Sequence, residues 1–183
     1  MRRDRTKSDP DSYSLSVAIV ETRYAVPGWG FGELWRRDEI VLAHDFHFAP
    51  VSDTVSDTKT DGSGDVLDGH AHELLGRFRA FLRGEDVSFA DVAIDVDWAT
   101  PFQRVLVDAL RTVPRGEVVS YGELAALAGR PGAPRAAGAL CAANRFAFVV
   151  PCHRVVAAHG IGGYGSAGAE VKRRLLALEG VEL

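Results

Sequence analysis

The hexapeptide at residues 151–156, Pro-Cys-His-Arg-Val-Val, brings together residue types that can carry out nucleophilic chemistry. Cys152 is followed directly by His153 and Arg154. A thiol in a cationic environment has a lowered pKa and a larger fraction of thiolate, which is the reactive form. We therefore predict that Cys152 is a nucleophile with a lowered pKa. A half-buried structural cysteine is the alternative, because neighbours in sequence need not touch in space.

The remaining cysteines and histidines give no sign of a metal or cofactor. Cys141 is the only other cysteine, and no CxxC pair occurs, so neither a disulfide framework nor a cysteine-rich zinc site is indicated. Two histidine pairs have spacings that could hold a metal: His44 with His47, and His70 with His72. We interpret all four as surface or loop histidines, because a metal site needs more convergent ligands. A free thiol favours a reducing, cytoplasmic compartment. No apolar run reaches the roughly 18 residues that a membrane span needs.

The net charge of −4 is unevenly distributed along the chain. Residues 1–98 contain 11 Lys/Arg and 19 Asp/Glu, a net −8, whereas residues 99–183 contain 10 and 6, a net +4. A basic C-terminal half is typical of a local polyanion-binding surface, although two domains of different composition would also produce it.

Helical signals dominate the chain from Pro101 onwards. Apolar residues recur at helical spacing, and Pro114 and Gly116 end the pattern. The members of this stripe are Phe102, Val105, Leu106, Ala109, Leu110 and Val113. Residues 120–123 form a capping box that opens a second helix through Ala128. A tight turn at residues 129–133 then leads to a third helix, from Pro134 to about Ala143, and the last two helices suggest a helix-turn-helix.

Two short features complete the prediction near Cys152. Asn144 tolerates the left-handed conformation that ends helices. Residues 146–150 are apolar and are predicted to form a strand that leads into the cysteine.

The N-terminal half has weaker signals. We predict a disordered tail at residues 1–13, strands near 15–19, 32–35 and 39–48, a flexible polar loop at 51–69, and a helix around 74–82. Residues 88–98 join this half to the next. The domain prediction is therefore a small α/β unit at 14–98, followed by a mainly helical unit at 99–183.

The order and spacing of several C-terminal motifs resemble the O6-alkylguanine-DNA alkyltransferases, also called methylated-DNA–protein-cysteine methyltransferases. The residues that carry the resemblance are the 151–156 hexapeptide, Thr100-Pro-Phe-Gln-Arg, Gly116-Glu-Val-Val-Ser-Tyr, Leu124-Ala-Ala-Leu-Ala-Gly, Gly163-Tyr, Lys172 with Leu175-Leu176, and Glu179-Gly. The resemblance implies an α+β fold, with a ribonuclease-H-like N-terminal domain and a winged-helix-like C-terminal domain. It also implies irreversible transfer of an alkyl group from O6 of guanine to the protein's own thiol, with O4 of thymine as a further candidate site of the alkyl group.

The resemblance implies specific catalytic roles. Cys152 matches the alkyl acceptor, His153 the base that deprotonates it through a water, and Glu179 the carboxylate that orients this histidine. Tyr121 matches a tyrosine that assists base rotation and supplies a proton.

The resemblance also implies how DNA is bound. Arg135 matches the arginine that enters the base stack when the target base flips out, and Ala136, Ala137, Gly138 and Ala139 match the small face of a recognition helix in the minor groove. Asn144 matches a hinge asparagine, and Val155, Tyr164 and Gly165 match the guanine pocket. The implied partner is double-stranded DNA containing O6-alkylguanine, bound by a monomer with little sequence preference.

The chain departs from the family pattern at four places. Val107 replaces an aromatic residue and is expected to be repacked core. Arg115 replaces another aromatic residue and is expected to be neutral or to bind phosphate. Arg145 replaces a proline and predicts a less rigid hinge. The segment from Val156 to Tyr164 is one residue short, with compensation after Tyr164.

Two other classes of function remain open from the residues. One is a non-catalytic sensor of alkylated DNA, against which the presence of Cys152 argues. The other is a thiol enzyme acting on small molecules, which the small-faced helix and basic C-terminal half disfavour.

Overall fold

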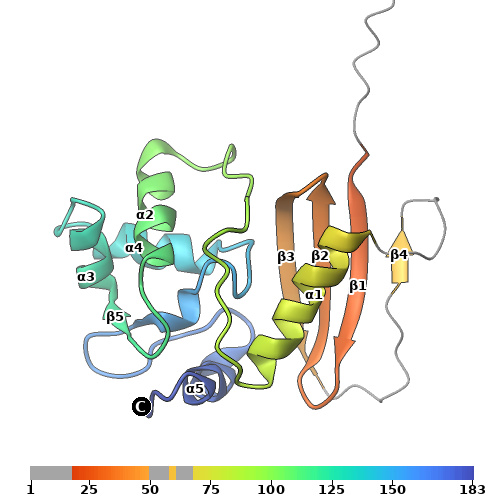
Figure 1. The fold of residues 1–183 in the computed structure, drawn as a ribbon. Helices are drawn as coiled ribbons and strands as arrows, with labels where there is room; N and C mark the ends of the chain where they lie inside the picture. The colour runs from red at the N-terminus through yellow and green to blue at the C-terminus, as the bar shows by residue number, and fades with distance from the viewer. Residues whose placement is uncertain (1–17, 50–57, 61–67) are drawn as a thin grey trace, which may run out of the picture.

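The computed structural model describes residues 18–49, 58–60 and 68–183. Its N-terminal part is an antiparallel sheet with strand order β3-β2-β1-β4 (Figure 1). The strands are β1 at Val20–Val26, β2 at Gly30–Arg37, β3 at Ile40–Phe48 and β4 at Thr58–Thr60. β3 therefore forms the edge of the sheet, and Figure 1 shows that this edge is the one nearer the helical part.

The strand predictions are confirmed in part. The predicted strand near 32–35 lies within β2, and the one predicted at 39–48 coincides with β3 except for its first residue. The strand predicted near 15–19 is wrong where the structure describes it, because β1 begins at Val20 and Ile19 is exposed. The predicted loop at 51–69 contains β4, which pairs with β1, so this part of the loop prediction is also wrong. The predicted tail at 1–13 lies outside the described residues.

Helix α1, at Gly69–Leu82, packs across one face of the sheet (Figure 1). Asp68 caps its first turn by accepting a hydrogen bond from the Ala71 amide at 2.8 Å. The predicted apolar face is confirmed, and its five members are buried: Leu74, Leu75, Phe78, Phe81 and Leu82. Burial of this face, rather than helix propensity alone, holds α1 on the sheet.

The C-terminal part contains α2 at Pro101–Arg111, α3 at Tyr121–Leu127, α4 at Pro134–Ala142 and α5 at Gly168–Leu178. A two-stranded parallel pair, β5 at Val119–Ser120 and β6 at Val155–Val156, joins the segment before α3 to the segment after Cys152. The predicted capping box of α3 is present, with Ser120 and Glu123 each bonding the other's backbone amide. Pro134 begins α4 as predicted.

Three local predictions for this part need correction. Val105 is 46% exposed whereas Val107 is buried, so the buried stripe of α2 is rotated from the predicted one. Asn144 does not have a positive φ; the left-handed residue is Phe148, with φ 67°. Residues 146–150 form a turn rather than a strand, because their backbone groups bond locally and to β3.

None of the helices in the described ranges combines the length and the apolar character that crossing a bilayer requires.

Candidate active site

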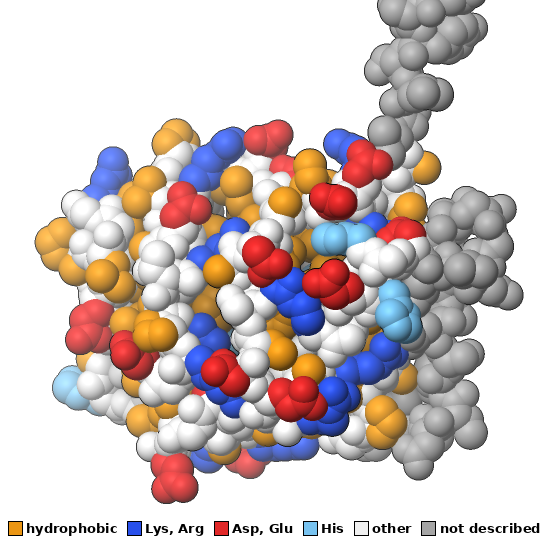
Figure 2. Space-filling model, viewed as in Figure 1, with side chains coloured by type: hydrophobic (Ala, Val, Ile, Leu, Met, Phe, Trp, Pro, Cys, Tyr) orange, Lys and Arg blue, Asp and Glu red, His pale blue; other side chains and the backbone are white. Residues whose placement is uncertain are grey.

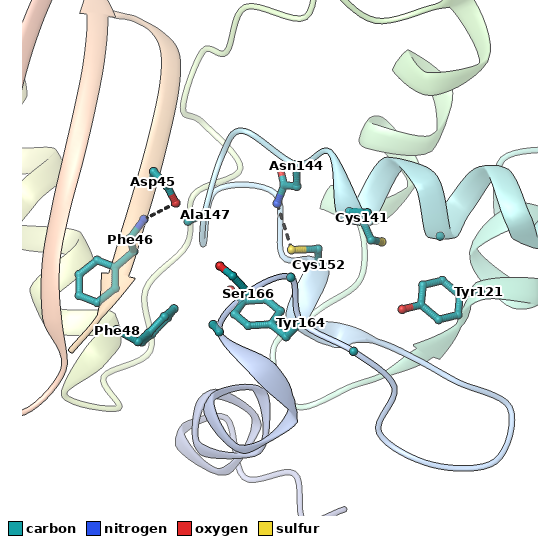
Figure 3. Close-up of a pocket in the computed structure, with 15 residues that line it drawn as sticks. Asp45, Phe46, Phe48, Tyr121, Cys141, Asn144, Ala147, Cys152, Tyr164 and Ser166 are labelled. Carbon is teal, nitrogen blue, oxygen red and sulfur yellow. Dashed lines mark hydrogen bonds between the residues drawn. The ribbon is translucent and has the colours of Figure 1, made fainter.

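A pocket of about 350 Å³ lies between the sheet edge and the helical part, and Cys152 lines it (Figure 3). β3 contributes Asp45, Phe46 and Phe48 to its wall. The opposite side comes from α3, α4 and the turn after α4: Tyr121, Gly138, Cys141, Ala142, Asn144 and Ala147. The segment that leads into α5 adds Gly163, Tyr164, Gly165, Ser166 and Ala167.

Asn144 holds the Cys152 sulfur in place. Its Nδ2 donates to Cys152 Sγ at 3.1 Å and to the Val150 carbonyl at 2.9 Å. Its Oδ1 accepts from the Phe146 amide at 3.0 Å, which fixes the amide group so that nitrogen faces sulfur. Cys152 itself begins a short 3-10 helix, η1 at Cys152–Arg154.

The prediction that the pKa of Cys152 is lowered by its sequence neighbours is wrong. Burial raises the pKa of Cys152, and the hydrogen bond from Asn144 and the charge of Lys172 only oppose this effect. His153 and Arg154 do not supply a cationic environment at the sulfur, because both side chains turn away to Glu179. Adjacency in sequence therefore did not translate into contact.

Glu179 gathers His153 and Arg154 into a buried cluster. Its Oε1 lies 2.9 Å from His153 Nε2, and Arg154 donates to both carboxylate oxygens at 2.9 and 2.8 Å. Arg154 also donates to the Val113 carbonyl at 2.7 Å. Burial would raise the pKa of Glu179, but the bonds from His153 and Arg154 prevail and lower it to about 2.

The protonation of His153 follows from these contacts. A carboxylate can only accept, so Nε2 carries the hydrogen and Nδ1 is the bare nitrogen. Burial lowers the pKa of His153, which keeps the ring neutral, although Glu179 opposes that shift. Nδ1 is buried and has no hydrogen-bond partner among the described residues. The ring thus presents one free acceptor.

Lys172 fixes the loop that leads from η1 towards Tyr164. This lysine is fully buried, and its ammonium donates to the carbonyls of Val155, Ile161 and Gly163. Val155 does not line the pocket as predicted: its side chain is buried and its carbonyl faces Lys172. Tyr164 and Gly165 do line it.

Two tyrosines border the pocket with their hydroxyl groups protonated at neutral pH. Burial raises the pKa of Tyr121, and the nearby thiols add to the effect. Burial raises the pKa of Tyr164 still further. In Figure 3 the Tyr121 hydroxyl points towards the pocket, so a proton donor is available on the side opposite the sheet.

Helix α4 presents part of its small-residue stripe to solvent. Arg135 and Ala139 are exposed, and Gly138 lines the pocket beside Tyr121. Ala137 is fully buried, so its predicted contact with DNA is wrong. On the face shown in Figure 2, basic and acidic side chains are interspersed rather than gathered into one large basic patch.

Three residues that depart from the sequence pattern of the alkyltransferases have structural roles. Val107 is buried core, as predicted. Arg115 is not free for phosphate, because its guanidinium donates to the carbonyls of Gly84, Glu85 and Leu178. Arg145 stacks over Trp98 at 4.8 Å from the ring centre, and its carbonyl accepts from the His44 amide at 2.7 Å. The residue after Asn144 is thus anchored without a proline.

Sequence reasoning missed the contribution of β3 and of Cys141 to the pocket. Cys141 follows Gly138 by three residues on α4, so helical periodicity could have placed the two on one face. Nothing in the sequence of β3 signals that Asp45 and Phe48 meet residues a hundred positions away. His44 was interpreted as a surface histidine, and this is wrong: it is buried and bonds Tyr24 and Ala147. Within the described ranges no group of three or more His, Cys, Asp or Glu is placed to hold a metal.

Comparison with known proteins identifies the family of this chain. A family profile described as the DNA-binding domain of 6-O-methylguanine DNA methyltransferase matches residues 101–181. The Mycobacterium tuberculosis O6-methylguanine methyltransferase (OGT), solved in complex with DNA, has 32% sequence identity to this chain. The two structures superpose with a TM-score of 0.69 over 87% of this chain and 92% of that one. The chain belongs to the methylated-DNA–protein-cysteine methyltransferase family.

Curated members of the methyltransferase family match about three fifths of this chain. A Methanothermobacter thermautotrophicus methylated-DNA–protein-cysteine methyltransferase is 40% identical over 111 residues, which are 61% of this chain and 62% of the relative. The Mycolicibacterium paratuberculosis protein is 48% identical over 110 residues, 60% of this chain and 63% of the relative. The match to this chain thus covers less than two thirds of the length of each of these relatives. Its α+β architecture is shared with the solved M. tuberculosis structure over nearly the whole length.

Proposed function

We propose that this protein repairs O6-alkylguanine in double-stranded DNA by transferring the alkyl group to its own Cys152. The observation that carries the proposal is the placement of this thiol. It lines a pocket large enough for a flipped base, is held by Asn144, and lies next in sequence to a neutral histidine that is oriented by a buried carboxylate.

The proposed reaction balances with groups of the protein and water molecules that carry protons between them. The Cys152 proton passes through a water to Nδ1 of His153, whose other nitrogen is engaged by Glu179. The sulfur–carbon bond then forms as the carbon–O6 bond breaks. Guanine keeps the bonding electron pair and takes a proton from the Tyr121 hydroxyl, which a proton from His153 replaces through solvent. Since no later step breaks the thioether, each molecule reacts once.

The proposed recognition of DNA uses α4 as a slim helix in the minor groove. Its support is the exposure of Arg135 and Ala139, with Gly138 facing the pocket and Ala136 half-buried beside them. The target atom is inaccessible in a duplex, so the guanine must flip out, with Arg135 filling the stack. Small residues and one wedge read little sequence, which suits a repair protein that must act anywhere in DNA.

We further propose the finer assignment of the fold: a ribonuclease-H-like unit at 14–98 and a winged-helix-like unit at 99–183. The antiparallel sheet with α1 supports the first, and α2 to α4 with the β5–β6 pair support the second. We also propose that the protein acts as a monomer in the cytoplasm and uses no metal or cofactor. This proposal fits the chemistry, which needs only one reduced thiol. Both cysteines are free.

The test compares the variant Cys152→Ala with the control Cys141→Ala. The control is matched because it also removes one thiol from the pocket. Each protein is incubated with a duplex carrying one O6-methylguanine, and the remaining lesion is measured by chromatography of the digested DNA. We expect no repair by Cys152→Ala but retained, salt-sensitive binding to the duplex, and repair by Cys141→Ala. Repair by Cys152→Ala would refute the nucleophile. Wild-type protein that binds the lesion without repairing it would indicate a sensor, and absence of both would indicate a thiol enzyme for small molecules.

A further inference from the structure

His44 forms a buried bridge between the N-terminal sheet and the turn that precedes Cys152. Its Nδ1 lies 2.6 Å from the Ala147 carbonyl, and its Nε2 lies 2.8 Å from the Tyr24 hydroxyl. The ring stacks on Phe78 with centres 4.0 Å apart and planes 1° from parallel. The proposed chemistry uses none of these contacts directly.

The hydrogen bonds of His44 have a defined direction. A carbonyl only accepts, so Nδ1 must carry the hydrogen, and Nε2 of the neutral ring then accepts from the Tyr24 hydroxyl. Burial lowers the pKa of His44 to about 4, although the bond to Ala147 and the charge of Asp45 oppose the shift. The ring therefore stays neutral in one tautomer at any pH at which the protein would act on DNA.

Tyr24, a residue of β1, is itself held in place by close packing. Its ring covers Gly32 of β2, where a Cβ would approach the ring to 2.2 Å, and it is almost fully buried. Any larger residue at position 32 would displace the donor of the His44 bond. The sheet thus supplies a rigid anchor for the imidazole.

The backbone of His44 holds the same turn. Its amide donates to the Arg145 carbonyl at 2.7 Å, and its carbonyl accepts from the Ala147 amide at 2.9 Å. These bonds clamp the chain on both sides of Phe146, whose amide donates to Asn144 Oδ1. The orientation of the Asn144 side chain, and hence its bond to Cys152 Sγ, depends on this clamp.

We propose that His44 is a positioning residue for the reactive thiol: by holding Ala147, it keeps the Asn144 amide nitrogen aimed at Cys152. The consequence of this role of His44 for DNA repair rests on the proposed function, but the effect of His44 on the thiol does not. Without the bond from Nδ1, the Ala147 carbonyl loses its side-chain donor and the turn relaxes. The thiolate then loses the hydrogen bond that opposes the effect of burial on the Cys152 pKa.

Two substitutions separate positioning from general stability. His44→Asn places an amide nitrogen near the position of Nδ1, so it can still donate to Ala147, whereas His44→Gln reaches the position of Nε2 instead. Both lose the ring and its stacking on Phe78, so both should be destabilised to a similar extent in urea unfolding. His47→Gln is the control, because His47 lies on the same strand, is exposed and bonds Glu33.

The readout is the pH dependence of Cys152 alkylation by iodoacetamide, mapped to its peptide by mass spectrometry. We expect His44→Gln to slow alkylation at neutral pH about tenfold and to move the midpoint of the pH profile to higher pH. A tenfold change corresponds to the loss of about one hydrogen bond to a charged group. His44→Asn should lie within about twofold of the wild type, and His47→Gln should be unchanged. The other titratable groups around the pocket are the same in all variants: Asp45, Lys172, Cys141, Tyr121 and Tyr164.

Equal profiles for the folded His44 variants and the wild type would overturn the proposal. If the variants do not fold, nitrogen NMR of the wild-type protein can determine the tautomer of the His44 ring. A proton on Nδ1 supports the proposal, and a proton on Nε2 overturns it. Iodoacetamide needs no DNA, so a protein that shows the expected profiles but repairs no O6-methylguanine would refute the proposed function and leave the role of His44 intact.

Discussion

At the scale of single residues, the site depends on side chains that are fixed by hydrogen bonds from other side chains. Cys152 is set by Asn144, and His153 is set by Glu179, 26 residues further along the chain. The sequence motif predicts which residue types meet, and the resemblance predicts the roles of His153 and Glu179. Neither predicts the part of Arg154, which neutralises Glu179 rather than activating the thiol.

Glu179→Gln tests the buried cluster through the dependence of stability on pH. The folded-state pKa of about 2 lies below the ordinary 4.5. The ionised carboxylate therefore stabilises the fold fully above pH 4.5, and this contribution disappears as pH falls towards 2. We expect the variant to lose on the order of 3 kcal/mol of unfolding free energy at neutral pH. The difference from the wild type should shrink in urea unfolding below pH 4.5.

The matched control is Glu170→Gln, which breaks the exposed pair with Arg173 on α5. An exposed pair contributes less than about 1 kcal/mol, so its loss should be small at every pH. A Glu179→Gln deficit that stays constant from neutral pH down to pH 2.5 would contradict the assigned role of the ionised carboxylate.

At the scale of elements, capping and periodicity predicted the helices well because these signals are local. Ser120 and Glu123 fix the start of α3, and Pro134 fixes that of α4. The turn at residues 146–150 was not predicted, since its conformation depends on bonds to His44 in a distant strand. Apolar composition alone cannot distinguish a buried turn from a strand.

Ala139→Glu tests α4 as the DNA-contacting helix. A carboxylate on this exposed position should repel phosphates and widen a helix that must fit a narrow groove, so we expect at least tenfold weaker duplex binding. The fold should be unaffected, because the side chain is solvent-exposed. Ala177→Glu, at an exposed position of α5, makes the same charge change outside α4. Equal loss of binding by both variants, measured by fluorescence anisotropy, would exclude a specific role for α4.

At the scale of the whole molecule, arginines join the two parts through backbone carbonyls. Arg111 donates to Phe89, Ala90 and Val92, and Arg115 joins the end of α1 to the end of α5. Arg174 donates to Gly28 and stacks on Trp29. These bonds hold the N-terminal part and the helical part together. This could not be predicted from sequence, because a carbonyl acceptor leaves no trace in residue type.

Arg115→Ala distinguishes this structural role from phosphate binding. We expect a loss of about 2 kcal/mol in urea unfolding, since several bonds from one charged group are removed at once. DNA affinity of the folded protein should stay within about twofold of the wild type. Arg173→Ala, an exposed arginine on α5, serves as the control for losing one positive charge. Unchanged stability with weakened DNA binding would reverse the assignment and restore the phosphate role.

Intact-protein mass spectrometry after incubation with an excess of O6-methylguanine duplex shows whether Cys152 accepts one alkyl group per molecule. We expect every protein molecule to gain one methyl group and no more, the methyl to map to the peptide containing Cys152, and repair to stop at one lesion per protein. Repair that continues beyond one equivalent, or a methyl group found on Cys141 instead, would contradict this expectation.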